Sequence, residues 1–170
     1  MADKLAPAAR SRNMAQIKGK NTKPEIKLRS LLHRAGFRFR IHVNTLPGTP
    51  DIVLPRYRTV IFVNGCFWHR HENCKYAYNP KSRQDFWQKK FSSTIKRDCE
   101  KTDKLMRAGW QVLTVWECEL RNNPEAIVHD LALKIIDFTN QSNRKHYTRE
   151  SPSTGLIATL VSCYTTAEEA

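Results

Sequence analysis

The chain has 170 residues and 40% hydrophobic content, enough to bury one core, so we expect a single domain. No apolar run approaches the roughly twenty residues of a membrane span, and the N-terminus lacks the apolar stretch of a signal peptide, so we expect an intracellular protein. The 29 lysines and arginines against 16 acidic residues give a formal net charge of +13, which favours a nucleic acid as partner over anionic lipid.

The five cysteines are an odd number, and an intracellular compartment keeps thiols reduced. The count therefore argues against a disulfide framework. It leaves metal binding or simple burial as the two interpretations.

The chain begins with a polar, basic segment, residues 1–20, which we expect to be a flexible arm able to lie along phosphates. Thr22 and Glu25 then form a capping-box pattern that predicts a helix from residue 22 to 35. Residues 37–43 alternate between apolar and polar side chains, which predicts a strand with one buried face.

Two short apolar runs follow and predict a hairpin of central strands, and an irregular stretch rich in Cys, His and aromatic residues comes after them. The expected elements after residue 50 are strands at 51–54 and 59–64, a helix at 82–108, a strand at 111–116 and a helix at 124–138. These patterns predict a mixed α/β domain over residues 21–138, with helices on both sides of a mixed central sheet, and a weakly structured tail over 139–170.

The irregular stretch contains Cys66, His71 and Cys74, and Cys118 follows the last predicted strand. Three thiolates and one imidazole suit a closed tetrahedral zinc site with a structural role. The spacing is not that of a standard zinc finger, so buried free cysteines are the alternative.

Asp51 is the only carboxylate between Glu25 and Glu72, and it opens an apolar strand. A carboxylate at that place is either a solvated strand end or a ligand that presents Mg²⁺ at a rigid edge. Glu25 is explained equally well as the helix cap and as a group that orients the water shell of the ion.

His69 lies in the irregular stretch and has the side chain that most readily transfers a proton near neutral pH, although a surface histidine is the commoner case, as we expect for His33 and His42. Phe67, Trp68 and Trp87 make an aromatic group among basic residues. Such side chains either line the core or wedge into a base stack where a pair is already mismatched.

Three segments together resemble the very short patch repair (Vsr) endonucleases: Pro50-Asp51, the run Val60 to His69 that contains Gly-Cys-Phe-Trp-His, and the run Gly109 to Cys118. The resemblance extends from about Arg12 to Leu120. It implies a zinc-containing, restriction-endonuclease-like fold and an Mg²⁺-dependent enzyme that nicks DNA 5′ of the thymine in a T:G mismatch left by deamination of 5-methylcytosine.

The resemblance also implies roles for individual residues. Asp51 and the backbone carbonyl of Val63 would hold Mg²⁺, His69 would be the general acid or base, and Glu25 would assist near the attacking water. The other implied roles are zinc binding by Cys66, His71, Cys74 and Cys118, and insertion beside the mismatch by Phe67, Trp68 and Trp87. From the basic N-terminal arm and the basic residues around the aromatic group, we also expect Arg12 and Lys89 to contact DNA.

Asn64 is a departure, because some members of the family carry a histidine there, and an amide cannot transfer a proton at neutral pH. Two other functions remain open from the sequence: a restriction-like nuclease that cuts intact duplex, and a non-catalytic zinc-containing DNA-binding module. We expect a cytoplasmic, nucleoid-associated monomer of bacterial type that acts on mismatched duplex DNA and that accessory mismatch-repair proteins could recruit.

Overall fold

The computed structural model describes residues 6, 8–9, 12, 15–16 and 18–147, without the side chains of 142–147. A three-stranded mixed sheet forms its centre, in the order β1-β2-β3. β1 (Ile52–Leu54) pairs antiparallel with β2 (Thr59–Asn64), and β2 pairs in parallel with β3 (Gln111–Trp116). The predicted hairpin and the predicted mixed sheet are therefore confirmed, with the 3-10 turn η1 (Pro55–Tyr57) joining the first two strands.

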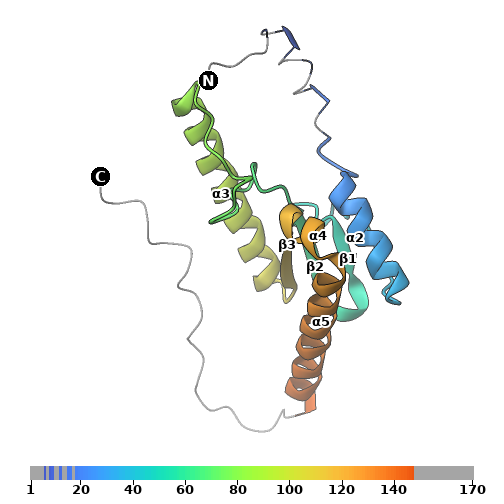
Figure 1. Ribbon diagram of the computed structural model, residues 1–170. Coiled ribbons are helices and arrows are strands. Elements are labelled where there is room, and N and C mark those ends of the chain that lie inside the picture. Colours follow the sequence, from blue (N-terminus) through green and yellow to red (C-terminus); the bar gives the residue numbers. More distant parts are fainter. Residues whose placement is uncertain (1–5, 7, 10–11, 13–14, 17, 148–170) are drawn as a thin grey trace.

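Helices cover both faces of this sheet (Figure 1). One face carries Ile52, Ile61 and Val115 and packs with α2 (Lys23–Arg34), α4 (Glu117–Asn122) and α5 (Pro124–Tyr147). The other face carries Val53, Val60 and Phe62 and meets Leu105 of α3 (Gln84–Arg107). Alternate residues of β1 and β2 thus enter two cores, which explains why β1 and the middle of β2 are continuously apolar.

The predicted strand at 37–43 is wrong. Only Arg40 pairs with a strand, through two backbone hydrogen bonds of 2.8 Å with Val53. His42 has φ 48°, a left-handed conformation that a continuous strand does not contain, and the chain turns away there.

The predicted helices are present with small differences in their bounds. The capping box at Thr22 and Glu25 is confirmed. On α3 the apolar pattern of the sequence would place Phe86, Ile95 and Met106 inward, but each of the three is at least 45% exposed. The short helix α4 was not predicted.

The last helix, α5, continues to Tyr147 instead of ending at residue 138, so the first part of the expected weakly structured tail is helical. Residues 148–170 and most of 1–17 lie outside the described residues, and so do the expectations made for them. No helix in the described part of the chain has the length and apolar character needed to span a membrane.

Candidate active site

Asp51 immediately precedes β1, and its carboxylate is held against β2. Its Oδ2 accepts a hydrogen bond of 2.8 Å from the backbone N–H of Val63. Burial raises the pKa of Asp51, and the hydrogen bond from Val63 lowers it without offsetting the effect of burial. The carboxylate is therefore placed rigidly in surroundings that disfavour its charge, as is usual for a group that binds a cation or a proton in function.

Glu25 lies beside Asp51 and is only 3% exposed. Its Oε1 accepts from the hydroxyl and the backbone N–H of Thr22, at 2.8 and 3.2 Å. Its Oε2 accepts from Arg29 Nη2 at 2.7 Å and from the Asn21 N–H at 2.9 Å. Glu25 is therefore both the helix cap and a buried anion next to Asp51, so the two sequence interpretations are compatible.

His42 completes this group. One ligand atom from each of Glu25, His42 and Asp51 lies within 4.8 Å of the other two, close enough for all three to reach one cation. The interpretation of His42 as an ordinary surface histidine is wrong, because its side chain is only 14% exposed and lies among charged groups. Two carboxylates suit a hard divalent cation, so the residues present fit the Mg²⁺ site that the sequence implies.

His69 lies in the loop after β2 and is paired with α3 instead of joining the Asp51 group. Its Nδ1 lies 2.5 Å from Asp98 Oδ2, and Lys101 Nζ lies 2.7 Å from Asp98 Oδ1. Burial raises the pKa of Asp98, but the hydrogen bonds from His69 and Lys101 outweigh it and lower the pKa overall. An ionised carboxylate on Nδ1 fixes the ring and leaves Nε2 available for a reacting proton.

Asn64 is the last residue of β2 and pairs with Trp116 of β3. Its side chain is buried, with 8% exposure. It therefore lies in the strand that provides Val63, one residue from the Asp51 contact.

The four predicted zinc ligands are brought together. Ligand atoms of Cys66, His71, Cys74 and Cys118 all lie within 4.8 Å of one another. The sheet register explains this, because Asn64 and Trp116 are partners and the two outer ligands, Cys66 and Cys118, each follow two residues later. The His71 ring stacks on Trp116 with centroids 4.2 Å apart and ring planes 7° apart, which fixes its orientation.

Three sulfurs and one nitrogen are the donor set of a structural zinc site, and the residues fit that ion. Burial raises the pKa of Cys66 to about 12, and burial also raises the pKa of Cys118. For Cys74, desolvation raises the pKa, but hydrogen bonds from the Tyr76 backbone and the other two thiols together lower it. The raised pKa values keep the Cys66 and Cys118 thiols neutral, and both thiols would ionise when a cation binds.

The three predicted wedge residues form one aromatic cluster. The Phe67 ring lies 5.0 Å from Trp68 and 5.2 Å from Trp87, and it also contacts Tyr78 and Phe91 at 5.1 and 5.3 Å. Trp68 and Trp87 lie 6.0 Å apart and are half-buried. The cluster therefore combines both sequence interpretations, with Phe67 at its centre and the tryptophans part exposed.

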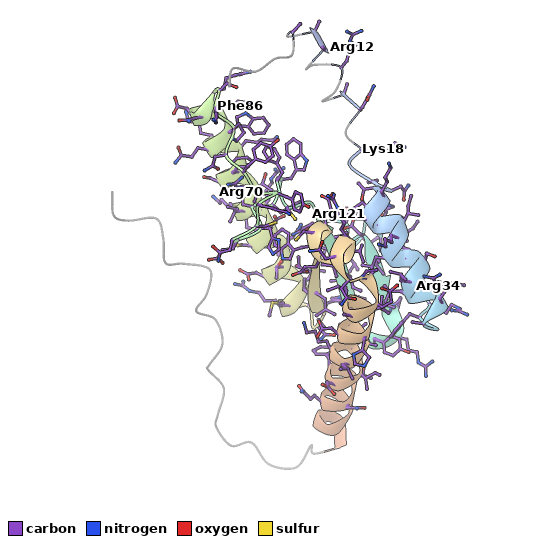
Figure 2. The ribbon with its side chains drawn as sticks, viewed as in Figure 1. Arg12, Lys18, Arg34, Arg70, Phe86 and Arg121 are labelled. Atoms are coloured by element: carbon purple, nitrogen blue, oxygen red, sulfur yellow. The ribbon has the colours of Figure 1, made fainter. Side chains whose placement is uncertain are left out.

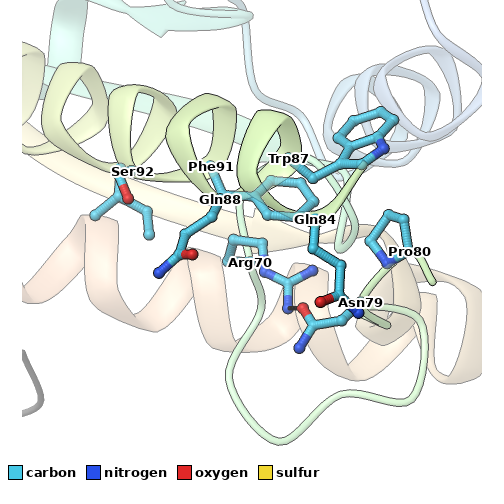
Figure 3. Close-up of a pocket in the computed structure, with 9 residues that line it drawn as sticks. Arg70, Asn79, Pro80, Gln84, Trp87, Gln88, Phe91 and Ser92 are labelled. Atoms are coloured by element: carbon cyan, nitrogen blue, oxygen red, sulfur yellow. Dashed lines mark hydrogen bonds between the residues drawn. The ribbon is translucent and has the colours of Figure 1, made fainter. Parts of the chain in front are cut away.

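A shallow pocket of about 470 Å³ borders this cluster. Figure 3 shows Trp87 and Phe91 of α3 on one side and Arg70 with Asn79 on the other. The Arg70 guanidinium lies 4.3 Å from the Phe91 ring centroid. Aromatic faces beside a cation are the surroundings in which nucleobases and phosphates bind.

Arg12 and Lys89, the remaining predicted DNA contacts, are both exposed. Arg12 belongs to the N-terminal segment that leads into α2, and Lys89 belongs to the first half of α3 (Figure 2). Neither has an ion-pair partner among the described residues, so both charges face solvent.

Sequence reasoning missed Asp98, Arg29 and His42. Asp98 lies 29 positions from His69, and Arg29 and His42 lie 13 positions apart. The only local signal was the spacing of Glu25 and Arg29, one helical turn apart in a predicted helix.

Comparison with known proteins identifies the family of this chain. A family model described as DNA mismatch endonuclease Vsr matches residues 2–75. The type II nicking enzyme V.XorIIP of Xanthomonas oryzae is 51% identical over 120 residues, which are 71% of this chain and 88% of that protein. The DNA mismatch endonuclease Vsr of Escherichia coli is 45% identical over 121 residues, 71% of this chain and 77% of that protein. Type II nicking enzyme V.NmeAIP of Neisseria meningitidis is 43% identical over 122 residues, 72% of this chain and 86% of that protein. This chain therefore belongs to the Vsr family of DNA nicking endonucleases.

Proposed function

We propose that this enzyme nicks one strand of duplex DNA 5′ of the thymine in a T:G mismatch, in a reaction that requires Mg²⁺, and so initiates very short patch repair. The observation that carries the proposal is the half-buried carboxylate of Asp51, fixed by the Val63 N–H beside the buried carboxylate of Glu25. Two carboxylates, one beside the edge strand β1 and one on α2, supply the oxygen ligands that a hard divalent cation needs for metal-dependent phosphodiester hydrolysis.

In this proposal Asp51 and the backbone carbonyl of Val63 would hold Mg²⁺. We also propose that the fold is of the restriction-endonuclease-like type. Bound Mg²⁺ would polarise the phosphate and stabilise the departing oxygen. Glu25 orients water near the phosphate. His69 acts as the general acid or base through Nε2, since its Nδ1 is paired with Asp98. Asn64 contributes hydrogen bonding without proton transfer.

Recognition of the mismatch rests on the aromatic cluster. Trp68 and Trp87 insert beside the mismatched pair with Phe67 supporting them, and the unstacking costs least where pairing is already weak. Arg12 and Lys89 contact the phosphates. Cys66, His71, Cys74 and Cys118 hold Zn²⁺, which fixes the loop that carries Phe67, Trp68 and His69.

The test is a nicking assay on an end-labelled duplex with one T:G pair in a CT(A/T)GG context, beside the matched duplex, each with Mg²⁺ or EDTA. We expect nicking of the thymine strand of the mismatched duplex in Mg²⁺ alone. Equal cutting of matched DNA would point to a restriction-like nuclease, and tight binding without cutting would point to a binding module.

Two variants test the assigned chemistry. Asp51→Ala and His69→Ala are expected to abolish nicking or reduce it at least about 10²-fold while mismatched DNA still binds. The controls are Asp130→Ala, an exposed carboxylate paired with Lys134 on α5, and His33→Ala on the exposed side of α2. Normal nicking by both site variants would contradict the assignment.

We also propose that the enzyme acts as a monomer, making one nick per encounter, and that accessory mismatch-repair proteins recruit it. Light scattering of the free and the DNA-bound protein measures the first part. A stable dimer on DNA would overturn it.

A further inference from the structure

We propose that His42 is a ligand of the divalent cation at Asp51 and Glu25, and that Arg29 is the resident cation which the metal displaces. The inference deepens the proposed function and rests on its metal site. It concerns two residues, His42 and Arg29, to which neither the sequence patterns nor the proposed mechanism gives a role.

The three candidate ligands come from separate parts of the chain. Glu25 lies in the first turn of α2, His42 in the segment before the turn that leads to β1, and Asp51 at the start of β1. The left-handed backbone of His42, with φ 48°, ends the extended segment there, and His42 Nε2 lies 3.9 Å from Glu25 Oε2. The imidazole nitrogen and the two carboxylates thus converge on one point, within 4.8 Å.

One nitrogen of Arg29 lies in that neighbourhood. Arg29 Nη2 lies 2.7 Å from Glu25 Oε2, 3.2 Å from His42 Nε2 and 3.2 Å from the backbone oxygen of Asp51. A positively charged group therefore contacts all three residues that would bind a cation. Because Nη2 contacts both Glu25 Oε2 and His42 Nε2, a metal ion bound to these two atoms would displace Nη2.

The contacts of Arg29 are those of a displaceable cation rather than of a completed structural ion pair. Its Nε is buried and has no hydrogen-bond partner in the described part of the chain, which is costly for a charged group with a purely structural role. Its other terminal nitrogen, Nη1, donates to Asn21 Oδ1 at 2.6 Å, outside the three-ligand group. Arg29 can keep this second contact when Nη2 withdraws.

The donor set predicts which ions the site prefers. An imidazole nitrogen added to carboxylates favours transition-metal ions over Mg²⁺, compared with an all-oxygen set. The site should therefore bind Mn²⁺ more tightly than Mg²⁺, and this preference should depend on His42.

The experiment measures Mn²⁺ binding to the zinc-loaded, DNA-free full-length protein by the electron paramagnetic resonance signal of free Mn²⁺, with Mg²⁺ as competitor. Asp51→Ala identifies the signal that belongs to this site. His42→Ala is expected to weaken Mn²⁺ binding about tenfold or more and to reduce the preference for Mn²⁺ over Mg²⁺. His33→Ala, the matched exposed histidine, should leave both unchanged. Wild-type Mn²⁺ affinity in His42→Ala would overturn the assignment of His42.

Arg29 is tested by charge. Arg29→Gln should tighten Mn²⁺ binding at least about fivefold, because it removes the competing cation. Arg29→Lys keeps the charge and serves as a second variant if the first fails to fold. Its Mn²⁺ affinity should stay below that of a variant without a positive charge at position 29. Unchanged or weaker binding in folded Arg29→Gln would overturn the competition.

The outcomes separate this inference from the proposed function. If His42→Ala binds Mn²⁺ normally and nicks T:G duplex in Mg²⁺, the inference fails and the function stands. If the wild-type protein nicks no duplex with any cation, the proposed function fails, while the Mn²⁺ affinities still decide the roles of His42 and Arg29.

Discussion

Single carboxylates in this enzyme are placed at some cost to folding stability. Burial disfavours the ionised form of Asp51, and a second carboxylate, that of the buried Glu25, lies nearby. Without a metal, the fold contains two close anions and one guanidinium. Binding sites commonly keep such destabilising charges because function requires them.

This gives a stability prediction for Asp51→Asn in EDTA. The pKa of Asp51 is raised in the folded state, so folding favours the protonated form, and stability is lost as pH rises through the folded pKa. The amide keeps an acceptor for the Val63 N–H without the charge. At pH 7 the variant should be more stable by roughly 1 kcal/mol, a gain of about 2–4 °C in melting temperature. The gain should shrink toward pH 4. Thermal unfolding measures it, and a less stable variant at pH 7 would contradict the argument.

The contribution of Asp98 to stability depends on pH in the opposite direction to that of Asp51. The pKa of its carboxyl is lowered in the folded state, because His69 and Lys101 outweigh burial. The ionised group therefore stabilises the fold above its unfolded pKa of about 3.9, and this contribution is lost as pH falls through the lower folded value. Asp98→Asn should be less stable than wild type at pH 7, with the difference closing below about pH 4.

The same variant tests whether Asp98 positions His69. Nicking by Asp98→Asn should fall up to about 10²-fold while DNA affinity stays constant, because the ring loses its orienting anion. Asp103→Asn, an exposed carboxylate of the same helix, is the matched control. A loss of DNA affinity with normal nicking of the bound duplex would instead indicate that Asp98 serves the fold of the loop.

At the scale of elements, the four-residue Cys/His cluster ties the ends of two strands together. Cys66 follows β2 and Cys118 follows β3, and the loop between Cys66 and Cys74 carries the aromatic and histidine residues of the site. A bound ion would therefore link the sheet to the loop that the proposed mechanism uses.

We predict that Cys118→Ser loses the metal and stability together. At free zinc about 1,000-fold above the dissociation constant, binding contributes about 4 kcal/mol, and at about 2–4 °C per kcal/mol the melting temperature should fall roughly 10 °C. Cys99→Ser, a change outside the cluster on α3, should retain zinc. Elemental analysis and thermal unfolding are the measurements. A Cys118→Ser protein with a full complement of zinc would remove Cys118 from the site.

The aromatic cluster gives a second prediction at this scale, because its members differ in their packing. Phe67 contacts four other rings, whereas Trp68 contacts only Phe67 and Trp87 among the described aromatic residues. Phe67→Ala should cost about 2 kcal/mol of stability, below the value for a fully buried ring. Trp68→Ala should cost little stability but about 1–3 kcal/mol of binding to mismatched duplex. Equal losses for the two variants would mean that the cluster is only core.

Elements with a local signal were the predictable ones. The capping box of Thr22 with Glu25 and the apolar runs of β1, β2 and β3 carry their structure in neighbouring residues, and each was confirmed. The strand at 37–43 failed because one backbone angle at His42 ends it, which side-chain alternation does not report. The partners of His69 and His42 were missed for a different reason, since pairing across 29 or 13 positions depends on tertiary packing.

At the scale of the whole molecule, the net charge of +13 is the property that most strongly favours binding to DNA. Exposed cations lie in the described part of the N-terminal segment, where Figure 2 labels Arg12 and Lys18, and along α3, which also carries Trp87 of the aromatic cluster. Each phosphate that such a cation neutralises releases counterions, so affinity for DNA should fall steeply with salt. In the proposed mechanism the aromatic cluster recognises the mismatch, so specificity for the mismatch should survive changes in these charges.

Arg12→Gln and Lys89→Gln test this division of roles. If each cation contacts one phosphate, each substitution should reduce the slope of log affinity against log salt by about 0.9. The ratio of affinities for mismatched and matched duplex should stay constant, because phosphates carry no information about the mismatch. Lys134→Gln, whose lysine is paired with Asp130 on α5, is the control and should leave the slope unchanged. Binding titrations at four or more salt concentrations measure both quantities. An unchanged slope would remove that cation from the interface, and a changed ratio would show that it reads the bases.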